Sequence, residues 1–216
     1  MSLDNTGAVE RPGVDWRRAE FVLTVLAFLG FITLAIRITN VYGGLPAHPL
    51  FVHVPVILIP AAVVGALVFM ARPDWFGRYG IALALLSIVA MSSIFLTMQA
   101  GAALRGELHL HGEAATLISE HSQAAHILAV VFTAFTAVLI VTFAAYRISG
   151  GRPTGLGIVD RLLSSRSTFN ALRILLVVLA LGAGFMTFRT GDLGAKAVWV
   201  GRLKAAQSGP TTPAAP

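Results

Sequence analysis

The chain alternates between long apolar blocks and short polar connections. Five apolar blocks, with charged residues only near their ends, cover approximately residues 21–39, 50–71, 80–103, 123–146 and 173–190. About 20 apolar residues are enough for one helix to cross the hydrocarbon core of a bilayer, and such blocks indicate membrane spans. The sequence therefore predicts an all-α membrane protein with five transmembrane helices. We expect a four-helix bundle core plus an N-terminal helix.

The polar segments complete the predicted domain organisation. Residues 1–20 are expected to form a cytoplasmic N-terminal segment, residues 21–203 one transmembrane helical domain, and residues 204–216 a disordered, low-complexity tail. No small-residue cleavage site follows the first block, which favours an uncleaved helix over a signal peptide. The connection over residues 104–122 is partly amphipathic and suggests a short interfacial helix.

Composition narrows the classes of function. The chain is 56% hydrophobic and 12% charged, whereas soluble domains carry about 25% charged residues. It contains no cysteine, which excludes disulfides, thiolate metal sites and covalent CxxCH haem attachment within this chain. The net charge of +6 comes from basic residues scattered around the block ends. This pattern does not indicate nucleic-acid binding, so the expected partner is the lipid bilayer. No P-loop or HExxH motif supports a nucleotide-driven pump or a zinc hydrolase.

The basic residues predict the orientation. Five crossings would place the N-terminus, the 72–79 turn and the 147–173 connection on one side, with ten arginines. The other side would carry six basic residues. Because cytoplasmic loops carry the excess of Lys and Arg, we expect a cytoplasmic N-terminus.

Two stripes of small and polar residues predict how the helices pack. Small residues at this spacing let helices approach closely in lipid. One stripe lies in the third block, at Gly80, Ala84, Ser87 and Ala90 or Met91. The other lies in the fourth block, at Ser122, His126, Ala129, Thr133 and Thr136 or Ala137. The second stripe is expected to face the bundle interior, so His126 should point inward.

The six histidines are the candidate functional residues, and the predicted topology places them all at one membrane face. They are His48, His53, His109, His111, His121 and His126. A histidine near hydrocarbon is costly without a partner and suggests a functional site. Four of them lie near the outer ends of the second and fourth spans and are candidate cofactor ligands: His48, His53, His121 and His126.

Three interpretations of these histidines remain open. Two facing imidazoles can serve as axial ligands of haem b, with His53 opposite His121 or His126. Their expected depths in the membrane, however, match His48 with His121 more closely. Imidazoles with nearby carboxylates can instead bind zinc, copper or iron, and His53, His121 and His126 are the candidate ligands. A structural histidine bonded to a backbone carbonyl is the third interpretation.

Three motifs resemble those of a bacterial family of predicted membrane proteins catalogued as a domain of unknown function. Residues 48–56 resemble its HPxxxHxP signature, residues 117–125 are similar to its LIxxHxxA element, and residues 190–199 are similar to its closing TGxxGG element. Ala195 stands where the family usually has a second glycine, and Trp199 where it usually has tyrosine.

The resemblance implies a location and a chemistry. The family's helix layout is similar to that of membrane-bound b-type cytochromes, which implies haem, electron transfer and a redox partner protein at the outer face. It also implies a multi-pass protein of a bacterial inner membrane, acting as a non-enzymatic electron-transfer or accessory protein. The motifs single out His48, His53 and His121, whereas the stripe in the fourth block singles out His126.

Overall fold

The computed structural model describes residues 16–33, 41–42, 45–108, 111–151, 155 and 157–207. Expectations for residues 1–15, His109 and residues 208–216 lie outside these ranges. The described elements are α1 (Trp16–Ile32), β1 (Val41–Tyr42), β2 (Leu45–Pro46), α2 (Ala47–Phe51), α3 (His53–Ala71), α4 (Pro73–Glu107), α5 (Gly112–Ser149), α6 (Gly157–Leu163) and α7 (Arg166–Gln207). The two-residue strands pair with each other in antiparallel register, and every longer element is a helix.

Four described segments are long and apolar enough to cross a membrane. They are Ala47–Ala71, which joins α2 and α3, Pro73–Glu107, Gly112–Ser149 and Arg166–Val200. These segments match the second to fifth predicted spans, so an all-helical membrane protein is confirmed. The 17-residue α1 is not among them, and a crossing by α1 is therefore not supported.

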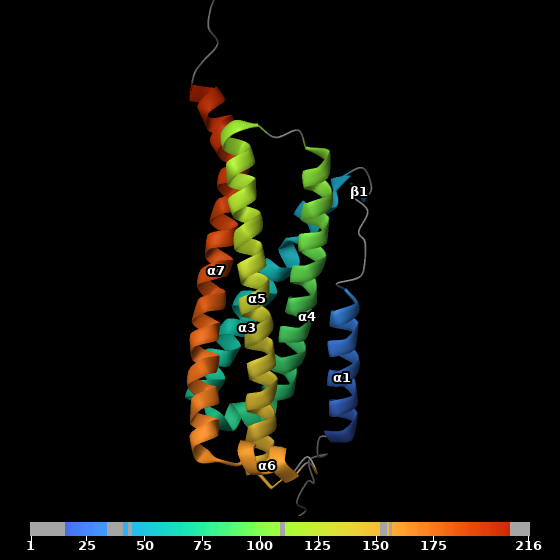
Figure 1. Ribbon diagram of the computed structural model, residues 1–216, viewed down its shortest axis with the longest axis vertical. Coiled ribbons are helices and arrows are strands. Elements are labelled where there is room, and N and C mark those ends of the chain that lie inside the picture. The colour runs from blue at the N-terminus through green and yellow to red at the C-terminus, as the bar shows by residue number, and fades with distance from the viewer. Residues whose placement is uncertain are drawn as a thin grey trace, which may run out of the picture.

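The four long segments form one bundle (Figure 1). Helix α5 packs along α7 and also against α4, and α3 packs against both α4 and α7. Helices α3 and α5 are therefore diagonal neighbours. Helix α1 lies outside the bundle against α4. A Cβ atom on Gly30 would lie 2.7 Å from the Ser92 hydroxyl oxygen, so glycine is what allows α1 this close approach.

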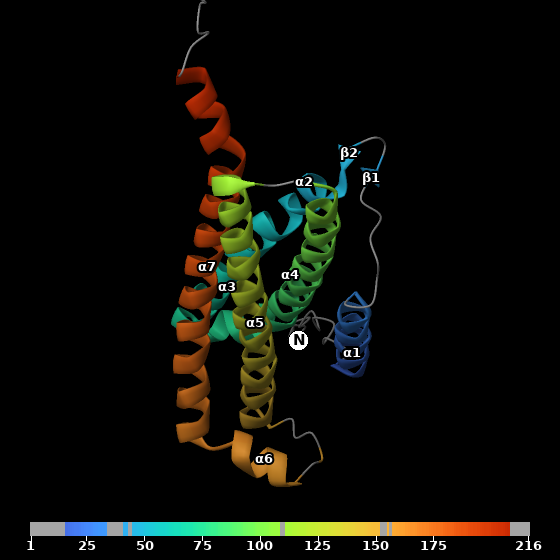
Figure 2. The same cartoon turned by 45° about the horizontal axis from the view of Figure 1, so that its top comes forward.

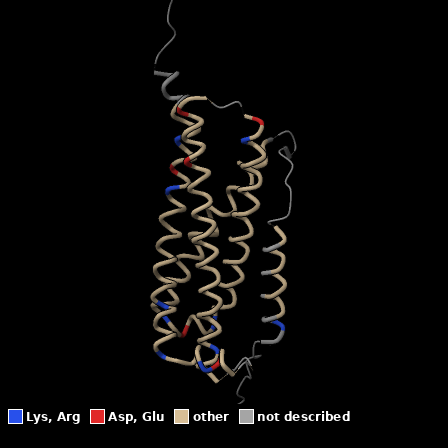
Figure 3. Tube along the Cα trace, in the orientation of Figure 1, with Lys and Arg blue, Asp and Glu red and all other residues tan. Residues whose placement is uncertain are grey.

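The long helices extend beyond the apolar blocks. Helix α4 runs to Glu107 and α5 begins at Gly112, so most of the 104–122 connection belongs to these two helices. The expected interfacial helix is the first part of α5. Gly112 has φ +63°, a left-handed conformation that glycine adopts without strain. Charged residues gather toward the two ends of the bundle in Figure 3.

We name the two ends of the bundle after the histidines and the arginines that lie there. The histidine end comprises α2, the C-terminal part of α4, the N-terminal part of α5 and the C-terminal part of α7. The arginine end comprises the C-terminus of α3, the N-termini of α4 and α7, the C-terminus of α5, and α6. Figure 2 shows α2 at the histidine end, running into α3. The two helices are separated by a turn at Val52.

The predicted stripe on α4 is confirmed as a packing surface. Gly80, Ala84, Ser87 and Ala90 are all buried. At the arginine end, a Cβ atom on Gly80 would lie 2.5 Å from the Phe143 ring of α5, so this contact requires glycine. The ring of Phe76 meets that of Phe143 edge to face, with centroids 5.6 Å apart. This close packing holds the helices together, because lipid supplies no hydrophobic driving force between them.

Candidate functional site: a histidine pair at one end of the bundle

The fold brings His48 and His121 together across the histidine end. Their ring centroids lie 6.2 Å apart, and the ring planes are nearly perpendicular, at 82°. His48 is on α2 and His121 is on α5, so the two residues are 73 positions apart in the sequence. Both rings are partly buried. The short helix α2 makes this contact possible because it packs against α4 before the chain turns into α3.

Helix α4 holds the His48 ring from one side. The His48 Nδ1 atom lies 3.0 Å from the carbonyl oxygen of Thr97. The Thr97 hydroxyl donates to the carbonyl oxygen of Phe51 at 3.2 Å, which fixes the last turn of α2 to the same position. One turn further along α4, a Cβ atom on Gly101 would lie 3.0 Å from His48 Nδ1. The absence of a side chain at residue 101 therefore lets the imidazole lie against the helix backbone.

Helix α7 holds the His121 ring in a similar way. The His121 Nδ1 atom lies 2.9 Å from the carbonyl oxygen of Thr190. A Cβ atom on Gly194 would lie 3.1 Å from Cε1 and 3.2 Å from Nδ1 of the same ring. Each histidine is thus bonded to a threonine carbonyl and packed on a glycine four residues further along the same helix.

The threonine carbonyls fix which nitrogen of each neutral imidazole carries the proton. A carbonyl oxygen only accepts hydrogen bonds, so Nδ1 must be the donor in both rings. In the neutral form this leaves an unshared electron pair on Nε2. Neither Nε2 atom has a hydrogen-bond partner among the described residues. An Nδ1–H bond to a backbone carbonyl is a common way of orienting a metal-binding histidine.

A buried hydroxyl lies beside the pair. The Thr190 Oγ1 atom is inaccessible to solvent and has no hydrogen-bond partner among the residues the structure describes. Burying a hydroxyl without a partner costs about 1–3 kcal/mol. Because the carbonyl of the same residue bonds His121, this unused hydroxyl belongs to the surroundings of the histidine pair.

The expectation that His126 points into the bundle is wrong. His126 is exposed, and its Nδ1 bonds the carbonyl oxygen of Ser122 in its own helix, at 2.8 Å. The buried face of α5 starts at His121 and continues through Ala124, Leu128, Phe132, Phe135 and Leu139. His126 follows His121 by five positions, which turns them about 140° apart around a helix of 3.6 residues per turn. The choice between them therefore falls on His121, the residue that the motif singled out.

His53 is not part of the ring contact between His48 and His121. It begins α3 and is exposed, so the expected pairing of His53 with a histidine of α5 inside the bundle is not formed. His111 precedes α5 and is exposed as well. The described residues contain no group of three or more His, Cys, Asp or Glu side chains that could hold a metal ion. The ligand set of His53, His121 and His126 is therefore not assembled.

The three sequence motifs converge on this pair. The first contributes His48, the second His121, and the third Thr190 and Gly194. Ala195, which departs from the family pattern, is exposed, so the close approach at His121 depends on Gly194 alone. Sequence reasoning missed Thr97 and Gly101, which no motif contains.

Comparison with known proteins identifies one family. Residues 44–207 match the model of a family described as "Predicted membrane protein (DUF2231)". No curated protein and no solved structure gave a significant match.

Proposed function

The chain belongs to the DUF2231 family of predicted membrane proteins, and from this premise we propose that His48 and His121 jointly bind one metal centre, the iron of haem b, for electron transfer. The observation that carries the proposal is the contact of two imidazoles whose Nδ1 atoms bind carbonyls and whose Nε2 atoms have no hydrogen-bond partner among the described residues. Haem held by two histidines requires no cysteine, and the chain has none.

The separation of the rings supports one shared ion. Metal–imidazole bonds are about 2.0–2.1 Å long, so two imidazoles that bound the same ion would have centroids up to roughly 6 Å apart. The observed centroid distance is 6.2 Å. Gly101 and Gly194 also keep the backbone beside each ring free of side chains. This ring separation and the two glycines support the proposal that His48 and His121 would hold the iron of a haem.

Each surrounding residue has a defined task in this proposal. The carbonyls of Thr97 and Thr190 orient the two rings and increase the basicity of their Nε2 atoms. Helix α2, packed against α4, positions His48, and helix α5, packed against α7, positions His121. Iron with two imidazole ligands supplies reversible one-electron chemistry. A donor and an acceptor of single electrons, of which one is a partner protein at the outer face, would complete the transfer.

We also propose how the chain crosses the membrane and in which membrane it lies. Helix α1 crosses the membrane as a fifth span, the N-terminus is cytoplasmic, and the protein resides in a bacterial inner membrane. The excess of arginine on the N-terminal side supports this orientation. The histidine pair then lies at the outer face.

A cofactor-free structural role is the second candidate, and a specific observation favours it. His48 already bonds the backbone of α4, and His121 that of α7. The pair could therefore act as a clasp that joins α2 to α4 and α5 to α7. A protein with this role would be an accessory membrane subunit, and its histidines would contribute to stability without binding a metal.

Histidine variants distinguish these two functions. The protein should be produced with ample haem, purified in detergent, and its haem content and visible spectrum measured. We expect about one haem per chain, lost or converted to a five-coordinate spectrum in His48→Ala and His121→Ala. His53→Ala and His126→Ala are the matched controls and should keep the wild-type spectrum. A colourless wild-type protein with lower stability in His48→Ala and His121→Ala would support the clasp instead.

A further inference from the structure

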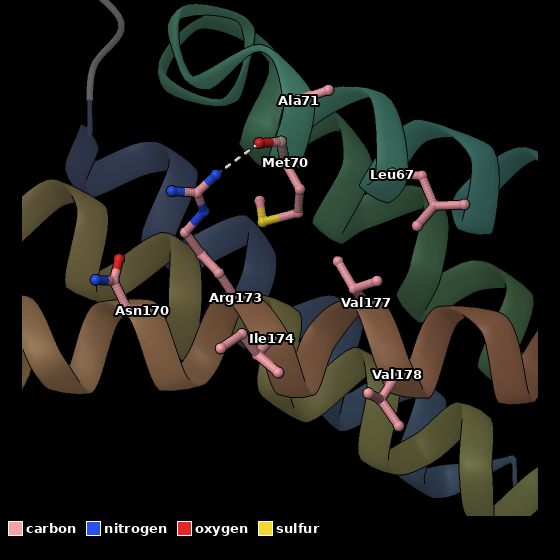
Figure 4. A pocket seen from close by; sticks show the side chains of 8 residues that line it. All are labelled: Leu67, Met70, Ala71, Asn170, Arg173, Ile174, Val177 and Val178. Atoms are coloured by element: carbon pink, nitrogen blue, oxygen red, sulfur yellow. Dashed lines mark hydrogen bonds between the residues drawn. The ribbon is translucent and has the colours of Figure 1, made fainter.

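A second feature lies at the arginine end, far from the histidines. An open groove of about 590 Å³ runs between the last turns of α3 and the first turns of α7 (Figure 4). Most of its lining is apolar, including Leu67, Met70, Val177 and Val178. Its polar groups are Arg173 and Asn170, and none of the described residues that line it is acidic.

The guanidinium of Arg173 makes few contacts with the described part of the protein. Its Nη2 atom donates to the carbonyl oxygen of Met70 at 2.8 Å, so the side chain reaches from α7 across to α3 (Figure 4). Its guanidinium also lies 5.9 Å from the Phe169 ring centroid. A guanidinium has five N–H donors, and this one makes no other hydrogen bond to a described residue. It therefore retains donors and a full positive charge for an external anion.

Exposed apolar residues of a candidate membrane span line the groove, so we expect it to open toward hydrocarbon. Ile174 and Val178 belong to its lining and are 68% and 59% exposed, within a segment able to span a membrane. Two further arginines lie at the ends of the same helices, Arg72 after α3 and Arg166 at the start of α7. An occupant must therefore combine a long apolar part with an anionic head at the level of Arg173.

We propose that this groove binds one anionic phospholipid, with its phosphate on Arg173 and an acyl chain along Leu67, Val177 and Val178. Arginine suits phosphate because its planar fork can donate two parallel hydrogen bonds. Because the described lining residues include an arginine and no carboxylate, the groove favours an anionic headgroup. The site is independent of the histidine pair and of haem.

Native mass spectrometry of the detergent-purified full chain tests this proposal. The probes are phosphatidylglycerol and phosphatidylcholine with identical acyl chains. We expect one phosphatidylglycerol to bind about tenfold more tightly than phosphatidylcholine, and Arg173→Gln to abolish the difference. The matched control is Arg161→Gln, in exposed α6 outside the groove, which should keep the preference. Equal losses in the two variants, or no preference in the wild type, would overturn the proposal.

Two further experiments separate the contribution of the lipid headgroup from that of the acyl chain. Val178→Trp fills the groove from an exposed position and should weaken binding of both lipids without impairing folding, which circular dichroism checks. If Arg173→Gln fails to fold, Val178→Trp provides the test without it. Phosphatidylglycerol binding by Val178→Trp that equals wild-type binding would then overturn the proposal. Inorganic phosphate in millimolar excess should not displace the lipid, and displacement would contradict an acyl-chain contribution. A dimer that Val178→Trp abolishes would assign the groove to a second copy of the chain and also contradict the proposal.

Discussion

Gly194 and Gly191 offer a matched pair of substitutions on one helix. A Cβ atom added at Gly194 would lie 3.1 Å from Cε1 and 3.2 Å from Nδ1 of His121, whereas one added at Gly191 would meet nothing within 4 Å. Replacing glycine by alanine in a helix interior stabilises the folded state by about 1 kcal/mol. Gly191→Ala should therefore raise the free energy of unfolding by roughly this amount.

Gly194→Ala should have the same gain in helix stability as Gly191→Ala, but it also introduces a steric cost. The His121 ring must move by a few tenths of an ångström, which lengthens its 2.9 Å hydrogen bond to the Thr190 carbonyl. Overpacking of this kind typically costs about 1–3 kcal/mol. Gly194→Ala should thus be less stable than Gly191→Ala by about 1–3 kcal/mol. Equilibrium unfolding in mixed detergent micelles measures the difference. Equal stability of the two variants would refute the close approach of His121 to α7.

Three further predictions follow from the packing and the topology. In the same unfolding assay, Gly80→Ala should be less stable than Gly106→Ala by about 1–3 kcal/mol, because a Cβ atom at residue 80 would lie 2.5 Å from the Phe143 ring, whereas one at residue 106 would meet nothing within 4 Å. In protein without haem, the free energy of unfolding of His48→Ala and of His121→Ala should each fall by about 1 kcal/mol, because each loses one hydrogen bond. Replacing the exposed His53 or His126 by alanine should change it by less than about 0.5 kcal/mol. Reporter fusions at residue 155 should be active only in the cytoplasm and those at residue 112 only outside, and the opposite pattern would invert the orientation.

The four spans of the bundle could be predicted because they depend on length and hydrophobicity alone. Their ends could not, because helices α4, α5 and α7 continue past the apolar blocks into polar sequence, where backbone hydrogen bonding sustains them. The 17-residue α1 illustrates the limit of such a prediction. Its apolar block was expected to form a helix over residues 21–39, whereas the described helix covers Trp16–Ile32 and is not among the four segments long and apolar enough to span a membrane.

The candidate site was only partly predictable. His48 and His121 were among the four candidates, and the family motifs pointed to both. The stripe on α5 led to His126 because small and polar residues were expected inside, whereas Phe132, Phe135 and Leu139 fill that interior. Thr97 and Gly101 could not be found, because every residue carries a carbonyl acceptor and a glycine in an apolar helix does not show which ring lies against it.

Electron paramagnetic resonance of the oxidised protein, produced with ample haem, tests the central claim most directly. Two imidazoles on one ferric ion should give a low-spin signal in the wild type, and protein labelled with ¹⁵N-histidine should show coupling to two ligand nitrogens of imidazole. Both features should disappear in His48→Ala and in His121→Ala and persist in His126→Ala. A wild-type protein without a ferric signal, or a low-spin signal that survives in His48→Ala or His121→Ala, would contradict ligation by this pair.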